Sequence, residues 1–255
     1  MDFEEPFDID LSVKDKQQYF PPTSSNNLQK LRITNVALYS ATPPNQVEFM
    51  YQIINRYYTY EQIKKMTITD AGACIGSNTY CLSQYFDKVN FVEISPKHVK
   101  IFQHNLDILY PHQQNIYVFQ DNYLDIYDKI HQEIILLDPP WSGPNYYKQK
   151  DLEICYLKNS QCVSVSDLIE LLAKYCDMIA IKLPKNYDID HKIIQKTTFP
   201  YHEIIPIKRN TGGIIYYIVI LSRKIAKKRS KITNNSHFES PKYRQMHWDK
   251  IYPSI

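Results

Sequence analysis

Short apolar runs alternate with helical segments over most of this chain, and this alternation constrains its fold more than any other feature. The runs expected to form strands are 66–71, 89–93, 116–119, 134–137, 178–183, 201–207 and 214–221. Helical spacing separates most of these runs, and strands joined through helices pair in parallel, with helices on both faces of the sheet. Gly212-Gly213 marks a tight turn, so the last two strands are expected to form an antiparallel hairpin. We therefore predict an α/β, Rossmann-like fold with a mixed seven-stranded sheet.

The regions on either side of this α/β domain, predicted as residues 67–222, differ from it in composition. Residues 1–35 are polar and predict a flexible lead. Residues 36–66 are predicted to form an N-terminal helical extension. Within it, apolar side chains at helical spacing over 44–65 predict a helix that starts near Pro43-Pro44. Residues 223–255 hold nine Lys/Arg against two Asp/Glu. They predict a basic, disordered tail of the kind that can bind phosphates or serve as a nuclear address.

Composition places the chain among soluble globular proteins, with 44% hydrophobic and 22% charged residues. No apolar run approaches the roughly 20 residues of a membrane span. The acidic N-terminus does not fit a secretory signal or a transit peptide. The five cysteines form no C-x-x-C pair and have no His cluster nearby. We expect them to be reduced thiols in an intracellular protein that holds no metal.

Small and acidic residues follow the first three predicted strands. Those after the first strand are Asp70, Ala71, Gly72, Gly76, Asn78 and Thr79. Small residues let a ligand approach the backbone, and the helix that follows favours an anionic group at its N-terminus. Glu93 ends the second strand, where a carboxylate can accept both ribose hydroxyls. Asp121 follows the third strand and can accept an adenine amino hydrogen, with Asn122 assigned to the same site. This order suits S-adenosylmethionine better than NAD, because the full G-x-G-x-x-G is missing.

The segment Asp138-Pro139-Pro140-Trp141 follows the fourth predicted strand. Prolines lack an N–H and fix the backbone, so their carbonyls can point into a cleft. The Asp138 side chain and the Pro139 carbonyl can then hold the two hydrogens of an exocyclic amine, while Trp141 stacks on the ring that bears it. The same four residues are also compatible with a purely structural role, as a rigid loop that buries a Trp. The acidic residues after the three preceding strands favour methyl transfer to an amine.

Four segments resemble the trimethylguanosine synthase family, the RNA cap guanine-2-amino methyltransferases. In chain order they are 39–43 (Y-S-A-T-P), 70–79 (D-A-G-A-C-I-G-S-N-T), 138–146 (D-P-P-W-S-G-P-N-Y) and 183–190 (L-P-K-N-Y-D-I-D). The resemblance implies a class I S-adenosylmethionine-dependent methyltransferase that acts on the 2-amino group of a 7-methylguanosine RNA cap and yields a di- or trimethylguanosine cap. Related enzymes occur in eukaryotes and in some large DNA viruses. The implied location is the nucleus or cytoplasm, or the host cytoplasm or virion for a viral member.

The resemblance also implies roles for individual residues. Trp141 would stack on the cap base, which methylation at position 7 makes cationic. Ser40 would contact the cap and Thr42 the cofactor, while Tyr146 would either pack against Trp141 or touch the cap. Further substrate contacts are assigned to Lys185, Asn186, Lys208 and Arg209. The sulfonium is a good methyl donor, so the reaction needs no metal and no covalent intermediate. We expect a monomer whose partner is capped RNA and not a membrane.

Departures from the family pattern keep two alternatives open. Cys74 replaces the central glycine of the cofactor loop, Asp138 replaces a serine, and Ser142 and Asn145 replace a glycine and an acidic residue. One alternative is another amino methyltransferase, which acts on adenine in DNA or RNA or on a protein glutamine. The other is a cap-binding module that has lost catalysis. The number of methyl groups added also stays open.

Overall fold

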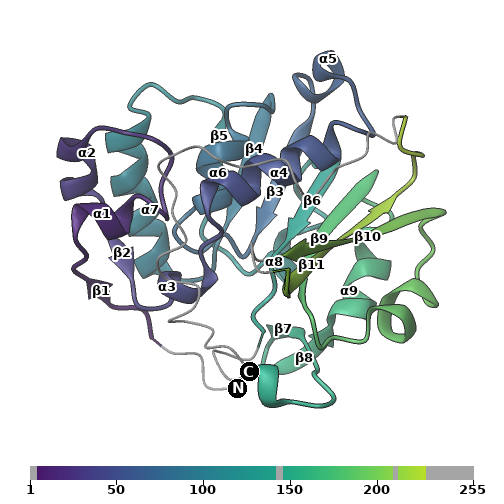
Figure 1. Ribbon diagram of the computed structural model, residues 1–255. Coiled ribbons are helices and arrows are strands. Elements are labelled where there is room, and N and C mark those ends of the chain that lie inside the picture. Colours follow the sequence, from purple (N-terminus) through teal and green to yellow (C-terminus); the bar gives the residue numbers. More distant parts are fainter. Residues whose placement is uncertain (1–4, 142–145, 209–211, 228–255) are drawn as a thin grey trace.

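The computed structural model describes residues 5–141, 146–208 and 212–227 and centres on a seven-stranded sheet of order β10-β11-β9-β6-β3-β4-β5 (Figure 1). Its strands are β3 (Thr67–Ala71), β4 (Lys88–Val92), β5 (Ile116–Phe119), β6 (Ile134–Leu137), β9 (Met178–Pro184), β10 (Tyr201–Lys208) and β11 (Ile214–Ser222). The five strands from β9 to β5 are parallel, and β11 is antiparallel to both of its neighbours. The predicted mixed seven-stranded sheet with a closing hairpin is confirmed.

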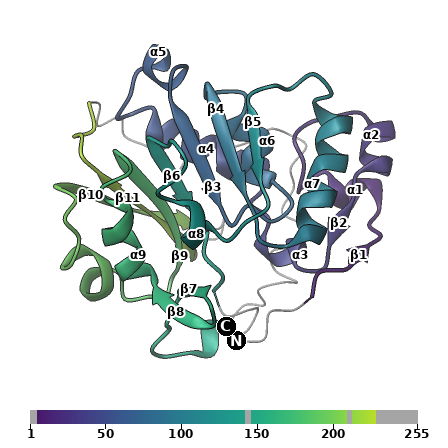
Figure 2. The same cartoon turned by 180° about the vertical axis from the view of Figure 1, so that it is seen from behind.

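Helices cover both faces of this sheet (Figures 1 and 2). They include α4 (Pro44–Ile54), α5 (Tyr60–Ile63), α6 (Ser77–Leu82), α7 (Pro96–Leu109), α8 (Tyr123–Ile126), α9 (Val165–Leu172) and the π-helix η2 (Asp190–Ile194). Along β6, Ile134 and Leu136 pack with α4, whereas Ile135 and Leu137 pack with α8 and α9. A strand buried on both faces needs apolar residues at every position, which explains its unbroken apolar run. No helix in the described part of the chain is long and apolar enough to cross a membrane.

The N-terminal residues are folded, unlike the flexible lead that the sequence predicted. Residues 5–40 contain β1 (Asp8–Ile9), α1 (Val13–Lys16), α2 (Ser25–Lys30), β2 (Ile33–Thr34) and α3 (Ala37–Ser40). Phe20, Leu28 and Ile33 are buried in one cluster with Phe102 of α7. Each such side chain contributes about 1.5–3 kcal/mol when it leaves water. The sequence analysis missed these buried apolar residues because polar residues separate them along the chain.

A small hairpin follows the D-P-P-W segment and was not predicted. It pairs β7 (Cys155–Lys158) with β8 (Gln161–Ser164) in antiparallel register. Its turn residues Asn159 and Ser160 have φ of 48° and 64°. Positive φ at both central positions gives a two-residue turn whose twist matches that of the strands.

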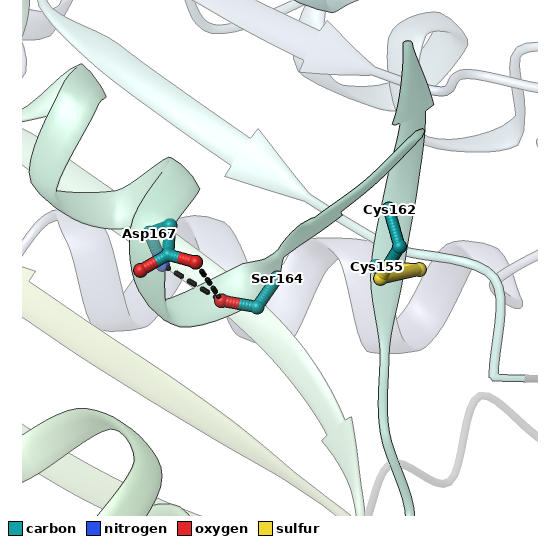
Figure 3. The surroundings of a disulfide bond; sticks show 4 residues. All are labelled: Cys155, Cys162, Ser164 and Asp167. Carbon is teal, nitrogen blue, oxygen red and sulfur yellow. Dashed lines mark hydrogen bonds between the residues drawn. A yellow bond between two sulfur atoms is a disulfide. The ribbon is translucent and has the colours of Figure 1, made fainter. Parts of the chain in front are cut away.

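The same hairpin corrects the prediction for the cysteines. Cys155 and Cys162 form a disulfide across the hairpin, with their Cα atoms 5.5 Å apart (Figure 3). The expectation of five reduced thiols is therefore wrong for this pair, because the hairpin register brings two residues seven positions apart to bonding distance. Cys74, Cys81 and Cys176 are free. Ser164 ends β8, and its hydroxyl accepts a hydrogen bond from the Asp167 N–H at the start of α9.

Two further segments differ from the sequence expectations. The helix expected near 44–65 is divided, since α4 ends at Ile54 and α5 begins anew after Thr59, which forms a capping box with Gln62. The basic tail was expected to be disordered from residue 223 onward, but the backbone N–H of Arg223 donates to the Asp177 carbonyl. The predicted basic tail from residue 228 onward lies outside the described residues.

Candidate active site

The loop between β3 and α6 contains three left-handed residues. Gly72, Cys74 and Gly76 have φ of 79°, 53° and 85°. A Cβ on Gly76 would lie 2.2 Å from the ring of Phe102, so only glycine fits there. A Cβ on Gly72 would lie 3.9 Å from the Asp138 carbonyl oxygen, an ordinary contact distance, so this loop lies directly beside the segment after β6. Cys74 stands where the resembling family has glycine, and a left-handed cysteine stores about 1–3 kcal/mol of strain.

Asp70 lies beneath this loop and is fully buried. Its carboxylate accepts hydrogen bonds from the side chains of Thr79 and Asn78, at 2.7 and 3.3 Å. Burial raises the pKa of Asp70 to about 7, against the lowering effect of these two donors, and the nearby Asp138 raises it further. The Asn78 side-chain oxygen is buried and has no hydrogen-bond partner within the described part of the chain.

Glu93, just after β4, braces the loop from the other side. Its two carboxylate oxygens accept from the backbone N–H groups of Cys74 and Ser95, at 2.7 and 2.8 Å. The His98 ring lies between this carboxylate, 3.6 Å away, and the Cys74 sulfur, 3.8 Å away. Burial lowers the pKa of His98, but Cys74 and Glu93 outweigh it and raise the pKa to about 10. Within the described residues, no group of three or more His, Cys, Asp or Glu side chains could hold a metal ion.

Asp121 and Asn122 lie after β5, at the same end of the sheet. Asp121 is exposed, and its carboxylate accepts only from the adjoining Asn122 backbone among the hydrogen bonds of the described residues. Asn122 caps α8 through Leu124 N–H and donates 2.7 Å to the Leu157 carbonyl of β7. Asn122 thus ties the β7–β8 hairpin to the site, a role that the sequence did not predict.

Asp138 lies at the end of β6, beside a buried lysine. The Lys182 ammonium donates to Oδ2 of Asp138 at 3.0 Å and to the Thr42 hydroxyl at 3.1 Å. The Thr42 hydroxyl in turn donates to the same Oδ2 at 3.4 Å. Burial raises the pKa of Asp138, and Lys182 and Thr42 oppose this rise. Pro139 is buried directly after it.

Trp141 packs in an aromatic group at the same end of the sheet. Its Nε1–H donates to the Lys182 carbonyl at 3.2 Å. The buried Tyr146 meets the indole edge-on at a centroid distance of 5.1 Å, and Tyr216 of β11 lies 6.1 Å away. Of the two roles considered for Tyr146, the structure shows packing against Trp141. The Lys182 ammonium lies 5.4 Å from the Trp141 ring centroid.

The remaining residues that the sequence predicted for the site differ in where they lie. Ser40 lies with its hydroxyl 3.4 Å from the Cys74 sulfur, on the cofactor loop, whereas Thr42 lies on Asp138. Asn186 donates to the carbonyls of Tyr146 and Gln149, at 3.1 and 2.9 Å, and so anchors the turn after the D-P-P-W segment. Predicted phosphate contacts Lys185 and Lys208 are exposed. Arg209, Ser142 and Asn145 lie outside the described residues.

Sequence reasoning missed two residues of the site. Lys182 is a single charge within the apolar run of β9, a signal that could have revealed it. Tyr156 of β7 gave no signal, because nothing in the sequence places the hairpin over the sheet. Its hydroxyl donates to the Ala71 carbonyl at 3.4 Å. Burial, and the charges of Asp138, Asp70 and Glu93, raise the pKa of Tyr156 well above its usual value.

These residues fit a nucleoside cofactor beside a reactive amine site. A Cβ on Gly72 would contact the Asp138 carbonyl, so the cofactor loop and the D-P-P-W segment are neighbours although 66 positions separate them in the sequence. Asp70 on β3 is fully buried and supports the loop, whereas the side chains of Glu93 after β4 and Asp138 after β6 each retain a small exposed fraction. Ligands of open α/β sheets bind at this carboxyl end of the strands.

Comparisons with known proteins agree with this geometry. A family model described as RNA cap guanine-N2 methyltransferase matches residues 65–244, more than half of the chain. The chain belongs to this family. It is 27% identical over 197 residues to an uncharacterized protein of Acanthamoeba polyphaga mimivirus, which covers 69% of this chain and 75% of the relative. It is 24% identical over 132 residues to trimethylguanosine synthase of Schizosaccharomyces pombe, with 50% and 54% covered.

Among solved structures, the chain resembles the 16S rRNA N2 G1207 methyltransferase of T. thermophilus in complex with AdoMet and guanosine. The TM-score is 0.50 at 12% identity, over 69% of this chain and 42% of that one, a likeness that concerns the fold alone. The fold is therefore that of a Rossmann-like class I methyltransferase, and the protein is an S-adenosylmethionine-dependent methyltransferase.

Proposed function

We propose that this protein transfers a methyl group from S-adenosylmethionine to the 2-amino group of a 7-methylguanosine RNA cap. The family match supports the reaction, and the observation that carries the proposal is Asp138 beside Trp141 at the end of β6, next to the loop at Gly72. A carboxylate, a proline carbonyl and an indole there supply what a planar exocyclic amine needs: two acceptors and a stacking surface.

The cofactor site would use the residues around the loop after β3. When bound, S-adenosylmethionine supplies an activated methyl group on a positively charged sulfur. Glu93 would accept from the ribose hydroxyls with the lone pairs that its two backbone hydrogen bonds leave free. Asp121, exposed at the end of β5, would accept from the adenine amino group. Asp70, Ala71, Asn78 and Thr79 would set the shape of the loop that receives the methionine part.

The amine site would hold the cap base against Trp141. A cationic base over an indole face is attracted by about 0.5–2 kcal/mol. One side of the indole already meets the Lys182 ammonium, so we expect the cap base on the other side, toward solvent. The Asp138 carboxylate and the Pro139 carbonyl would then accept the two amine hydrogens and aim the nitrogen lone pair at the methyl group. Such in-line positioning supplies much of the rate in transfers of this kind.

The cap phosphates require cations at the rim of the site. Lys185 is exposed directly after β9, and Lys208 is exposed at the end of β10. Both strands end on the side of the sheet where β11 places Tyr216 near Trp141. Lys185 and Lys208, with Arg209 beyond the described residues, are our candidates for the phosphate contacts.

Methyl transfer to two short capped RNAs, identical except for the 7-methyl group, tests the proposal. Transfer from labelled S-adenosylmethionine only to the 7-methylated cap, with the new methyl located on the 2-amino group by mass spectrometry, is the expected result. Transfer to neither RNA, by protein that binds the cofactor, would refute the cap substrate. Transfer to adenine or glutamine substrates in parallel reactions would identify the alternative amino methyltransferases.

A further inference from the structure

Lys182 is a buried cation next to the amine site, and it has no role in the proposed function so far. Its residue is 6% exposed, on the central strand β9. Burial of an ammonium is unfavourable unless it is paired, and here two oxygen acceptors and the rings of Trp141 and Tyr216 face it. Asp138 and Thr42 accept its hydrogen bonds at 3.0 and 3.1 Å, and the Tyr216 ring centroid lies 5.1 Å away.

The contacts divide the two oxygens of Asp138 into different roles. Both the Lys182 ammonium and the Thr42 hydroxyl bind Oδ2. No hydrogen bond within the described residues joins Oδ1, and the side chain is 15% exposed. Oδ1 is therefore the oxygen that the described residues leave free to accept from an amine. Because Oδ2 is held from two sides, the plane of the carboxylate is fixed.

We propose that Lys182 is a positioning residue for methyl transfer, one that fixes Asp138 through Oδ2 and keeps it an anion, with Oδ1 directed at the substrate amine. This inference rests on the proposed function. In the transfer the nitrogen–carbon bond forms as the sulfur–carbon bond breaks, and the sulfonium becomes a neutral thioether. The nitrogen then carries one proton too many, and Asp138 Oδ1 is the nearest place for that proton, which solvent later removes.

An anionic acceptor is needed for this step, and burial alone works against one. Four groups lie around the charge of Asp138: Lys182 on β9 is the cation and Thr42 a neutral donor, and both oppose the rise of the Asp138 pKa, while Asp70 on β3 and Tyr156 on β7 are acidic groups whose own pKa Asp138 raises. Loss of Lys182 removes the only cation among these four. The Asp138 carboxyl would then hold its proton to higher pH, and it would donate to the amine site where it should accept.

The variants Lys182→Met and Asp138→Asn/Lys182→Met separate this role from a structural one. Methionine keeps the length of the side chain, and the double variant removes both charges, so it leaves no unpaired ion in the core. In Lys182→Met we expect the acidic limb of the kcat–pH profile to move up by a pH unit or more. Each pH unit by which the limb moves should lower kcat at pH 7 about tenfold, and kcat should recover at high pH. The double variant should be slow at every pH.

A readout independent of activity is the infrared band of a protonated carboxyl group, titrated in the protein without cofactor. Lys182→Met should show one more protonated carboxyl at pH 7 than the double variant; Asp138 would be uncharged in both, so its effect on the pKa of Asp70 is the same in both. An unchanged band together with an unchanged pH profile would overturn the inference, as would a loss of kcat that high pH does not restore. If the wild type methylates no capped RNA, the proposed function fails, and the infrared titration still decides whether Lys182 keeps Asp138 ionised.

Discussion

Substitution of Gly76 by alanine should destabilise the protein far more than the same substitution at Gly72. Both residues have a left-handed backbone, with φ of 85° and 79°, so alanine meets about 1–2 kcal/mol of backbone strain at either position. Only at Gly76 does the new Cβ overlap another group, the Phe102 ring, at 2.2 and 2.5 Å. That ring is fully buried and stacks on Phe91 with centroids 3.8 Å apart, so it cannot move aside freely.

Overpacking of a core adds about 1–3 kcal/mol, so we expect a loss of about 2–5 kcal/mol for Gly76→Ala and about 1–2 kcal/mol for Gly72→Ala. Urea unfolding followed by circular dichroism measures both, with the slope of the transition compared to the wild type. Gly212→Ala is a further control, because its φ is 94° and nothing among the described residues lies within 4 Å of the new Cβ. Equal losses in all three variants would show that Phe102 yields and that the steric argument is wrong. Gly72→Ala should instead weaken binding of S-adenosylmethionine, which isothermal calorimetry measures.

Three further predictions concern pH and the hairpin. Burial raises the folded-state pKa of Asp70 to about 7, so the stability that its protonated form contributes is present below pH 4 and is lost as pH rises through 7. The free energy of unfolding of Asp70→Asn, measured across this range, should depend less on pH. The new amide can be accommodated, because Asn78 can turn the oxygen that has no partner among the described residues toward it. The folded-state pKa of His98 is about 10, so stability should fall from pH 6.5 to 10 in the wild type, and a similar fall in His98→Gln would contradict the assignment. Replacement of Cys155 and Cys162 by serine should lower stability by about 2–3 kcal/mol through the freed loop, and a peptide map without reductant that finds both cysteines unlinked would remove the basis of this expectation.

The sheet was predictable because its signal is local. Parallel strands buried on both faces must be continuously apolar, and runs such as 134–137 stand out from the polar segments around them. The acidic residues after three strands and the D-P-P-W segment after the fourth were also readable, because strand ends in such a sheet meet at one edge. Residues 5–35 and the β7–β8 hairpin were not predicted. Their apolar residues are scattered, and only the core that they pack against makes them regular.

The sequence by itself determined the α/β fold, the family, and the residue types of the site. The tertiary structure decided which of these residues touch. It placed Thr42 on Asp138, turned Asn186 toward the backbone that carries Tyr146, and brought Lys182 from β9 to Asp138 and Tyr156 from β7 to Ala71. Such contacts cannot be read along the chain, because they depend on how side chains from strands far apart in sequence share one dry, crowded space. A charged side chain is stable in such a space only where a side chain from another element pairs with it.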